Sequence, residues 1–176
     1  MEGIKRRLDE GADLNEIIAN DIGAWSAAAR HLAFFSYYQS ERRKRTRFMP
    51  PHVEVFWGET GTGKTRKAYD DLSYDPSKTW RWTPGTGATF MDGYNGQPHV
   101  IFDEFRGQIS FGQILALLDG YPMTVQIKGG SVHWCPMKII LTSPKSPKDW
   151  YPNLPEDSID QLLRRITKTT HFNKSL

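Results

Sequence analysis

A glycine-rich stretch is the first part of this sequence that could do chemistry. The letters GETGTGKT, residues 58–65, fit the pattern G-x-x-x-x-G-K-[ST], with Gly58, Gly63, Lys64 and Thr65 in the fixed places. Glycines carry no Cβ, so the backbone N–H groups of such a loop can turn inward around phosphate oxygens. The pattern predicts a nucleoside triphosphate site in which Lys64 reaches the terminal phosphates and the Thr65 hydroxyl binds Mg²⁺.

The surroundings of the loop favour the same interpretation. An apolar run precedes it, and the helix-like run KTRKAYDDL follows it. A helix that starts here would point the positive end of its dipole at the phosphates. The remaining loop residues are expected to bind the same nucleotide: Glu59, Thr60, Gly61 and Thr62.

Two neighbouring carboxylates could supply the second half of a hydrolytic site. The segment HVIFDEF, residues 99–105, is an apolar run that ends in Asp103 and Glu104. At the carboxyl edge of a parallel sheet, this pair would lie beside the glycine loop. Asp103 is predicted to hold the magnesium through its waters, and Glu104 to bind near the metal and to orient or deprotonate the attacking water. The alternative is an acidic pair that simply faces solvent at the end of a strand.

A third feature is a lysine on a glycine turn. The letters TVQIKGGSVHW, residues 124–134, predict a β-hairpin with Lys128, Gly129 and Gly130 at its turn. Such a hairpin presents a mobile positive charge to a partner. The alternative is an ordinary surface turn with a solvated lysine.

The elements around these residues indicate an α/β domain. Short apolar runs alternate with helical patterns from Val53 onward, which favours a mostly parallel sheet covered on both faces. Strands are expected at 53–57, 99–105 and 137–143, and helices at 63–72, 110–120 and 156–166. Ser110 with Gln113 forms a capping box for the second of these helices, and Gly120 stands where that helix should end.

The first 40 residues read as two helices, at 12–25 and 25–38. Asp13 with Glu16 forms a capping box at the start of the first. Each helix is predicted to carry an apolar stripe: Leu14, Ile17, Ile18 and Ile22 in the first, and Trp25, Ala28, Ala29, Leu32 and Phe35 in the second. So short a bundle cannot bury both stripes alone, so it should pack on the next domain or on copies of itself.

A basic run, ERRKRTRF at 41–48, and the pair Pro50-Pro51 follow these helices and indicate a domain boundary. A solvated hinge is the favoured interpretation; phosphate contact and a nuclear-import signal are the alternatives. The four aromatic residues Trp80, Trp82, Phe90 and Tyr94 are interpreted as packing residues rather than as platforms for nucleobases.

Composition sets only broad limits. The chain has 176 residues, a net charge of +3 and an isoelectric point near 9.0, which suits a nucleic-acid partner without requiring one. A single cysteine, Cys135, excludes a disulfide scaffold within the chain and favours a reducing compartment. No segment is apolar over enough residues to cross a bilayer, so no membrane partner is expected.

Taken in order and spacing, these motifs resemble those of superfamily 3 helicases. The resemblance is carried by GETGTGKT, MDGYNGQPHVIFDEF, LLDGYPMTVQIKGGSVHW, KIILTS, DWY and LLRRI, and runs from about residue 53 to 166. It is strongest to the C-terminal half of the replication initiator, Rep, of circoviruses and related circular single-stranded DNA viruses.

The resemblance implies a P-loop AAA+-like fold that works as an ATP- and Mg²⁺-dependent hexameric ring on single-stranded DNA. The hairpin would point into the channel, with Lys128, Gly129 and His133 at the DNA. A neighbouring subunit would supply an arginine, Arg164 or Arg165, to the γ-phosphate. The resemblance also implies an oligomerisation segment at 1–47, an ATPase domain at 48–176, and action in the host nucleus.

The sequence departs from the family at two points. Where the family ends its ITS strand with an asparagine that senses the γ-phosphate, this chain has Pro144, so Thr142 and Ser143 are the candidates to replace it. The nicking domain of Rep has no counterpart before Pro50, so we expect a helicase portion without endonuclease activity. Pro144 motivates an alternative function, a nucleotide-binding oligomerisation module with little turnover. A small-molecule kinase ranks last, because the hairpin has no role in it.

Overall fold

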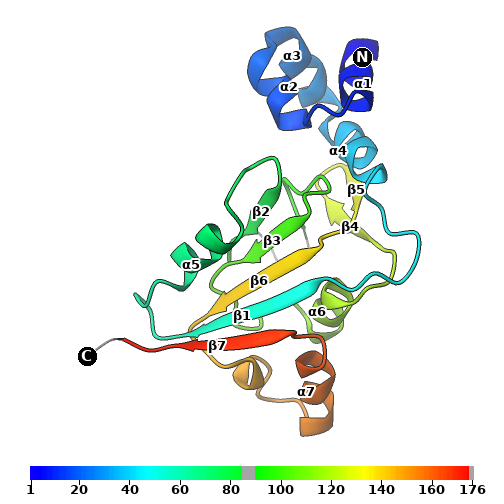
Figure 1. The fold of residues 1–176 in the computed structure, drawn as a ribbon. Coiled ribbons are helices and arrows are strands. Elements are labelled where there is room, and N and C mark those ends of the chain that lie inside the picture. The colour runs from blue at the N-terminus through cyan, green and yellow to red at the C-terminus, as the bar shows by residue number, and fades with distance from the viewer. Residues whose placement is uncertain (85–89, 175–176) are drawn as a thin grey trace.

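A parallel sheet of five strands forms the centre of the chain (Figure 1). The computed structural model describes residues 1–84 and 90–174. The strands lie in the order β2-β3-β6-β1-β7, and every neighbouring pair is parallel. Their bounds are β1 His52–Gly58, β2 Thr79–Trp82, β3 His99–Phe102, β6 Lys138–Ser143 and β7 Lys168–Phe172.

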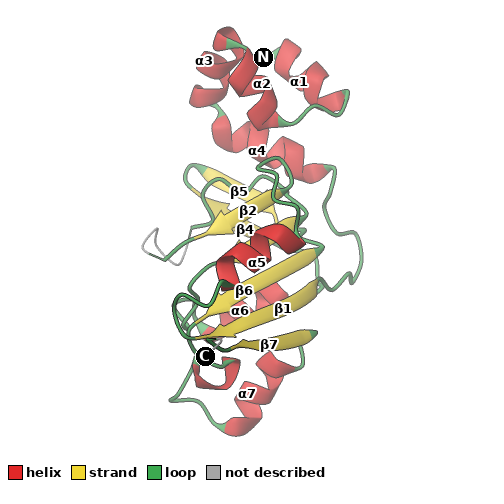
Figure 2. Cartoon of the chain, turned by 60° about the vertical axis from the view of Figure 1, so that its left-hand side comes forward, coloured by secondary structure: helices red, strands yellow, loops and turns green. Residues whose placement is uncertain are grey.

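Helices cover both faces of this sheet. Helix α5 (Lys64–Asp71) packs Ala68 against Phe56, Ile101 and Ile140 on one face. Helix α6 (Phe111–Leu118) lies behind the sheet in Figure 2 and packs Ile114 on the opposite face. The central strands β3 and β6 carry runs of apolar residues because alternate side chains enter these two cores. The predicted α/β fold, a P-loop sheet with flanking helices, is confirmed.

Two edge strands, β2 and β7, were missed by the sequence analysis. Strand β7 has the polar sequence KTTHF and pairs with β1 from Glu54↔Lys168 to Gly58↔Phe172. Strand β7 stands at the end of the strand order, so its sequence lacks the apolar run of a central strand. It follows helix α7 (Glu156–Leu163) and a one-turn helix, η1 (Pro147–Asp149).

The predicted hairpin is confirmed. Strands β4 (Thr124–Ile127) and β5 (Gly130–His133) are antiparallel, and Ile127 pairs with Gly130. Lys128 and Gly129 therefore form a two-residue turn, and Gly130, which was predicted to belong to the turn, is the first residue of β5. Gly129 has a φ of +87°, which favours glycine at this position.

The N-terminal prediction of two helices was wrong. There are four short helices: α1 Glu2–Asp9, α2 Leu14–Asn20, α3 Ile22–Arg30 and α4 Leu32–Glu41. Asp13 caps α2 as predicted, but Asp21 takes an extended conformation and accepts a hydrogen bond from the Ala24 N–H, which starts a new helix.

This break changes which apolar residues are buried. Leu14, Ile17, Ala28 and Phe35 do enter the core of the four helices. Three other residues of the predicted stripes stay at the surface: Ile22, Trp25 and Leu32 are 88%, 58% and 51% exposed.

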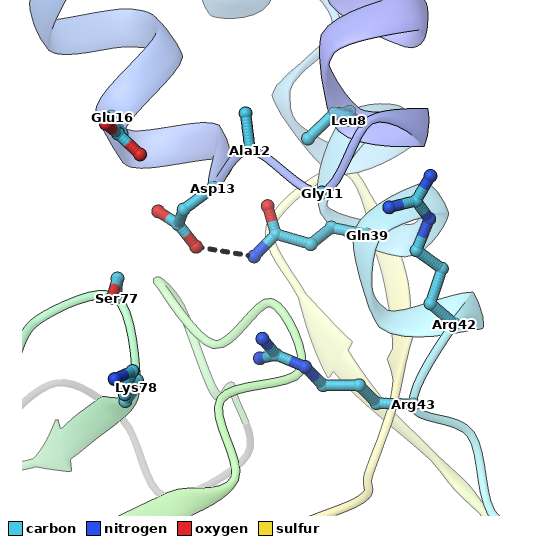
Figure 3. A pocket seen from close by; sticks show the side chains of 10 residues that line it. All are labelled: Leu8, Gly11, Ala12, Asp13, Glu16, Gln39, Arg42, Arg43, Ser77 and Lys78. Atoms are coloured by element: carbon cyan, nitrogen blue, oxygen red, sulfur yellow. Dashed lines mark hydrogen bonds between the residues drawn. The ribbon is translucent and has the colours of Figure 1, made fainter.

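Gln39 of α4 connects the helical segment to the α/β domain. Its Oε1 accepts from the Leu14 N–H at 2.7 Å, and its Nε2 donates to Asp13 at 2.9 Å and to Asn95 at 3.2 Å. Figure 3 shows Gln39 facing Asp13 in a pocket of about 240 Å³, with Lys78 on the sheet side.

The basic run is not wholly a solvated hinge. Arg45 is buried and donates to the carbonyl oxygens of Asp119 and Pro136, each at 2.9 Å. The hinge interpretation is therefore wrong at this residue, because its guanidinium ties the linker to the α/β domain. Its neighbours Lys44 and Arg47 are exposed.

Trp80, Trp82 and Tyr94 are buried in the main core, as the packing interpretation predicted, whereas Phe90 is 37% exposed. Among the described residues, no helix has the length and apolarity needed to cross a membrane.

Candidate active site

The glycine loop connects the end of β1 to the start of α5. Gly58 ends the strand with a φ of +144°, and a Cβ there would lie 2.1 Å from the carbonyl oxygen of Phe172 in β7. Gly63 caps α5 with a φ of +84° and has open space around it. The first glycine is thus required by a close approach of two backbones, and the second by the left-handed turn into the helix.

The loop offers donors for an anion. Across the described residues, no acceptor takes a hydrogen bond from the backbone N–H groups of residues 60–63. These groups precede the N-terminus of a helix, where the helix dipole favours negative charge. Glu59, Thr60 and Gly61 are exposed, and Thr62 is half-buried with its hydroxyl bonded to the Glu59 carbonyl. A phosphate group fits this arrangement.

Lys64 is buried inside the loop. Its Nζ donates to the carbonyl oxygens of Gly58 and Glu59, each at 2.7 Å, and to the Thr62 hydroxyl at 3.3 Å. Burial lowers the pKa of its ammonium group, although the nearby Glu104 and Asp103 carboxylates oppose that shift. The lysine therefore lies where a terminal phosphate held by the loop would meet it.

Thr65 and Asp103 are in direct contact. The Thr65 hydroxyl donates to Oδ1 of Asp103 at 2.8 Å, and the Thr142 hydroxyl donates to the same oxygen at 2.8 Å. Burial alone would raise the pKa of the Asp103 carboxyl, but the hydrogen bonds from Thr65, Thr142 and Arg81 outweigh it and hold the pKa below its usual range. The site therefore keeps a charged carboxylate beside the loop, as Mg²⁺ requires.

Glu104 adopts a backbone conformation that is unusual for its residue type. Its φ is +53°, and its N–H donates to the Thr142 hydroxyl at 3.0 Å while its carbonyl accepts from Gln108 at 3.0 Å. These contacts hold the residue in the left-handed region, which costs on the order of 1 kcal/mol. Its carboxylate is 35% exposed and lies 3.4 Å from Arg106.

These contacts suit magnesium better than a metal with an all-protein cage. Among the described residues there is no group of three or more His, Cys, Asp or Glu side chains that could enclose a metal ion. Mg²⁺ usually takes one or two carboxylates and completes its shell with water and phosphate oxygens. Thr65, Asp103 and Glu104 can meet that requirement.

The two residues proposed in place of the missing asparagine are both fully buried. Thr142 bridges Asp103 and Glu104, as described above. The Ser143 hydroxyl accepts from the Lys145 N–H at 3.0 Å and from Nε1 of Trp150 at 2.9 Å. Both hydroxyls therefore form hydrogen bonds with other groups of the protein, and only that of Thr142 contacts the acidic pair.

Arg81 is a member of this site that the sequence analysis missed. Its guanidinium pairs with Oδ2 of Asp103 and donates to the Tyr69 hydroxyl at 3.2 Å. The signal was the sequence TWRW, in which one charged residue alternates with two buried tryptophans. The sequence analysis did not recognise β2 as a strand that pairs with β3, so it had no reason to place Arg81 beside Asp103.

Arg164 and Arg165 lie far from the loop of their own chain. The Thr167 N–H, just beyond them, donates to the carbonyl of Val53 at the opposite end of β1 from Gly58. Val53 and Gly58 are about 17 Å apart at the usual rise of a strand, and Figure 1 shows α7 near the opposite end of the strands from the start of α5.

The two arginines also differ from each other. Arg165 pairs with Asp119 at 3.0 Å and donates to the Gln161 carbonyl at 2.7 Å. Arg164 is exposed, and its side chain has no hydrogen-bond or ion-pair partner within residues 1–84 and 90–174.

The hairpin separates its predicted DNA contacts. The Lys128 side chain is 83% exposed at the turn, with Asp92 3.6 Å from its Nζ. His133 lies at the base of β5 against α4, where its ring pairs with Glu41 at 2.5 Å and packs on Tyr37. Lys128 and Gly129 are therefore presented at the tip, whereas His133 connects the hairpin to the helical segment.

Comparison with known proteins places this arrangement among nucleic-acid enzymes. Residues 54–143 match the family model described as RNA helicase. The chain is also similar to several viral proteins, each named replication-associated protein. It is 37% identical over 123 residues to that of Porcine circovirus 1, covering 70% of this chain and 38% of the relative. It is 36% identical over 124 residues to that of Porcine circovirus 2, with coverage of 70% and 38%. For Goose circovirus the identity is 34% over 120 residues, covering 66% and 37%. The chain thus spans less than two-fifths of the length of these relatives.

Proposed function

Since this chain belongs to the RNA helicase family, as a superfamily 3 helicase domain similar to viral replication-associated proteins, we propose that it is an ATPase that moves along single-stranded DNA as a hexameric ring. One observation carries the ATPase part: the hydroxyl of Thr65 donates to Asp103 at 2.8 Å. That contact joins the end of the phosphate loop to the acidic strand, which is what a metal-dependent nucleotide site requires.

Each residue of the site has a role in this proposal. The N–H groups of residues 59–65 bind the phosphates, and Lys64 neutralises charge on the terminal ones. Thr65 and Asp103 hold Mg²⁺, which supplies positive charge to the β- and γ-phosphate oxygens when bound. Glu104 orients the attacking water and accepts its proton.

Thr142 contacts the Asp103 carboxylate and the Glu104 backbone, so we propose it, rather than Ser143, as the residue that responds to the γ-phosphate. Its hydroxyl bonds to both Asp103 and the Glu104 backbone, whereas Ser143 is bonded to Trp150 and Lys145.

The proposal of a ring rests on Arg164, which lies too far from the phosphate loop of its own chain to contact a nucleotide there. Arg164 lies near the opposite end of β1 from the loop, and its side chain has no hydrogen-bond or ion-pair partner among the described residues. A neighbouring subunit's loop is the site that it could complete, where a cation stabilises the charge that develops on the transferred phosphoryl group. Arg165, already paired with Asp119, is the weaker candidate. We further propose that residues 1–47 form the oligomerisation segment, because Ile22, Trp25 and Leu32 are left exposed there.

The hairpin is the proposed DNA element. Lys128 stands at its tip with most of its side chain in solvent, next to Gly129, whose φ of +87° makes the tight turn. His133 is tied to Glu41, so its proposed part is to hold the hairpin against α4 beside the strand of DNA. Similarity to the viral replication-associated proteins supports a role in replication, for which we propose the host nucleus as the setting.

A second candidate function is a nucleotide-binding oligomerisation module with little turnover. It is favoured by Pro144, which offers no side-chain hydrogen bond after β6.

The test is ATP hydrolysis with and without single-stranded DNA, for the native chain and for Lys64→Ala. We expect DNA-stimulated hydrolysis in the native chain and its loss in the variant. Lys67→Ala, which removes an exposed lysine one turn further along α5, should behave as the native chain. ATP-dependent hexamers that hydrolyse no faster than Glu104→Gln would favour the second function. A native chain that binds neither ATP nor DNA would contradict both.

A further inference from the structure

Arg81 connects the acidic pair to the helix that follows the phosphate loop. It lies on β2, next to β3, and its Nη2 pairs with Oδ2 of Asp103. Its Nη1 donates to the hydroxyl of Tyr69 on α5 at 3.2 Å, and the guanidinium carbon lies 5.7 Å from the centre of that ring. One cation thus has two anchors, a carboxylate and a tyrosine.

Both oxygens of Asp103 are engaged in these contacts. Oδ1 accepts from Thr65 and Thr142, and Oδ2 is paired with Arg81. Thr65 and Thr142 are neutral donors that a nearby metal tolerates. Arg81 is a positive charge on the oxygen that remains for a metal-bound water, and two cations on one carboxylate repel each other.

We propose that Arg81 competes with Mg²⁺ for Asp103 and thereby sets the metal concentration that the nucleotide site requires. This inference rests on the proposed nucleotide site and assigns it a built-in competitor. Arg81 is suited to leave Asp103, because its side chain is 38% exposed whereas that of Asp103 is 6% exposed. After it leaves Asp103, the guanidinium would still contact Tyr69, through a hydrogen bond to its hydroxyl and a cation–π contact with its ring.

The opposite role is a fixed support that holds Asp103 in position for the metal. The two roles predict opposite results when Arg81 loses its charge. Removing a competitor strengthens metal binding, whereas removing a support weakens it.

The experiment is a titration of Mn²⁺ into the full chain with saturating ADP, with free Mn²⁺ measured by electron paramagnetic resonance. Arg81→Gln should bind Mn²⁺ about three- to fivefold more tightly than the native chain, the upper part of the range expected for loss of one partly exposed ion pair. Arg81→Met, which keeps the length without the charge, should give the same shift. Arg66→Gln is the matched control, because it removes an exposed arginine from α5 near the loop, and it should change the Mn²⁺ affinity by less than about twofold.

Unchanged or weaker Mn²⁺ binding in both Arg81 variants would overturn the inference while leaving the nucleotide site intact. An equal gain in Arg66→Gln would also overturn it, because the effect would then be a general loss of positive charge. If the native chain bound neither ADP nor Mn²⁺, the proposed function itself would fail. Equilibrium ADP binding measured without metal separates these cases, because Arg81 has no role in holding the nucleotide alone.

Discussion

The hydroxyl of Thr142 donates a hydrogen bond to Oδ1 of Asp103 at 2.8 Å, and both groups are buried. The same hydroxyl accepts the N–H of Glu104, which sits in a left-handed conformation. A single side chain of β6 therefore fixes both members of the acidic pair.

Thr142→Val should reveal this role, because valine keeps the shape of threonine and removes the hydroxyl. The Glu104 N–H and one oxygen of Asp103 would lose a partner, and we expect the free energy of unfolding to fall by ~1–3 kcal/mol. ATP hydrolysis should fall more than nucleotide binding, because the acidic pair acts after the loop has bound. Chemical denaturation and steady-state kinetics measure the two effects, and Thr142→Ser, which keeps the hydroxyl, should retain most of both.

The charge of Asp103 predicts a pH dependence. Its pKa is depressed in the folded protein, since hydrogen bonds from Thr65, Thr142 and Arg81 outweigh burial. A group of this kind stabilises the fold above its unfolded pKa, about 3.9, and loses that contribution as the pH falls through the folded value. The difference in unfolding free energy between the native chain and Asp103→Asn should therefore be constant near neutral pH and shrink below about pH 4. A difference that instead grew on acidification would show that the carboxyl is not held in its charged form.

Gly58→Ala tests the contact between the phosphate loop and the last strand. The added Cβ would meet the Phe172 carbonyl at 2.1 Å, and neither backbone can move without breaking the pairing of β1 with β7. We expect a loss of ~2–4 kcal/mol in unfolding free energy, together with weaker nucleotide binding. Gly112→Ala is the control: it lies inside α6 with open space around it and should stabilise the chain by ~0.5–1 kcal/mol. If Gly58→Ala were as stable as the native chain, the close contact between Gly58 and the backbone of β7 would be contradicted.

Much of this site could be read from the sequence, because its residues follow apolar strands at fixed spacing. The loop and the acidic pair are local patterns, and the parallel sheet brings its strand ends to one edge. The sequence did not reveal the role of Arg81, because its partner Asp103 is 22 residues away and the strand that carries Arg81 has only four residues. The N-terminal helices were misjudged for a local reason: Asp21 and His31 interrupt stripes that look continuous in a helical projection.

Lys128→Ala should separate DNA binding from stability. The lysine is 83% exposed and its Nζ contacts only Asp92 within the described residues, so its removal should change the unfolding free energy by less than ~0.5 kcal/mol. Affinity for single-stranded DNA should fall, and the slope of its logarithm against that of salt concentration should decrease by about one phosphate contact. Lys148→Ala removes an exposed lysine of η1 and controls for net charge. Identical affinity and slope in Lys128→Ala and the native chain would exclude the hairpin tip from the DNA contact.

Arg164→Ala is expected to abolish hydrolysis without changing the fold. Its side chain has no partner among the described residues, so stability should be preserved, whereas an arginine supplied to a γ-phosphate contributes about 10³-fold or more to the rate. Arg165→Ala should do the reverse and cost stability, because it breaks the pair with Asp119 and leaves that carboxylate half-buried. Mixing subunits decides whether Arg164 acts between chains. Arg164→Ala and Lys64→Ala are each expected to be inactive alone, but a mixed ring contains interfaces that pair an intact loop with an intact arginine, so hydrolysis should partly return. If the arginine served its own chain, every subunit in the mixture would still lack one component, and mixing would restore nothing.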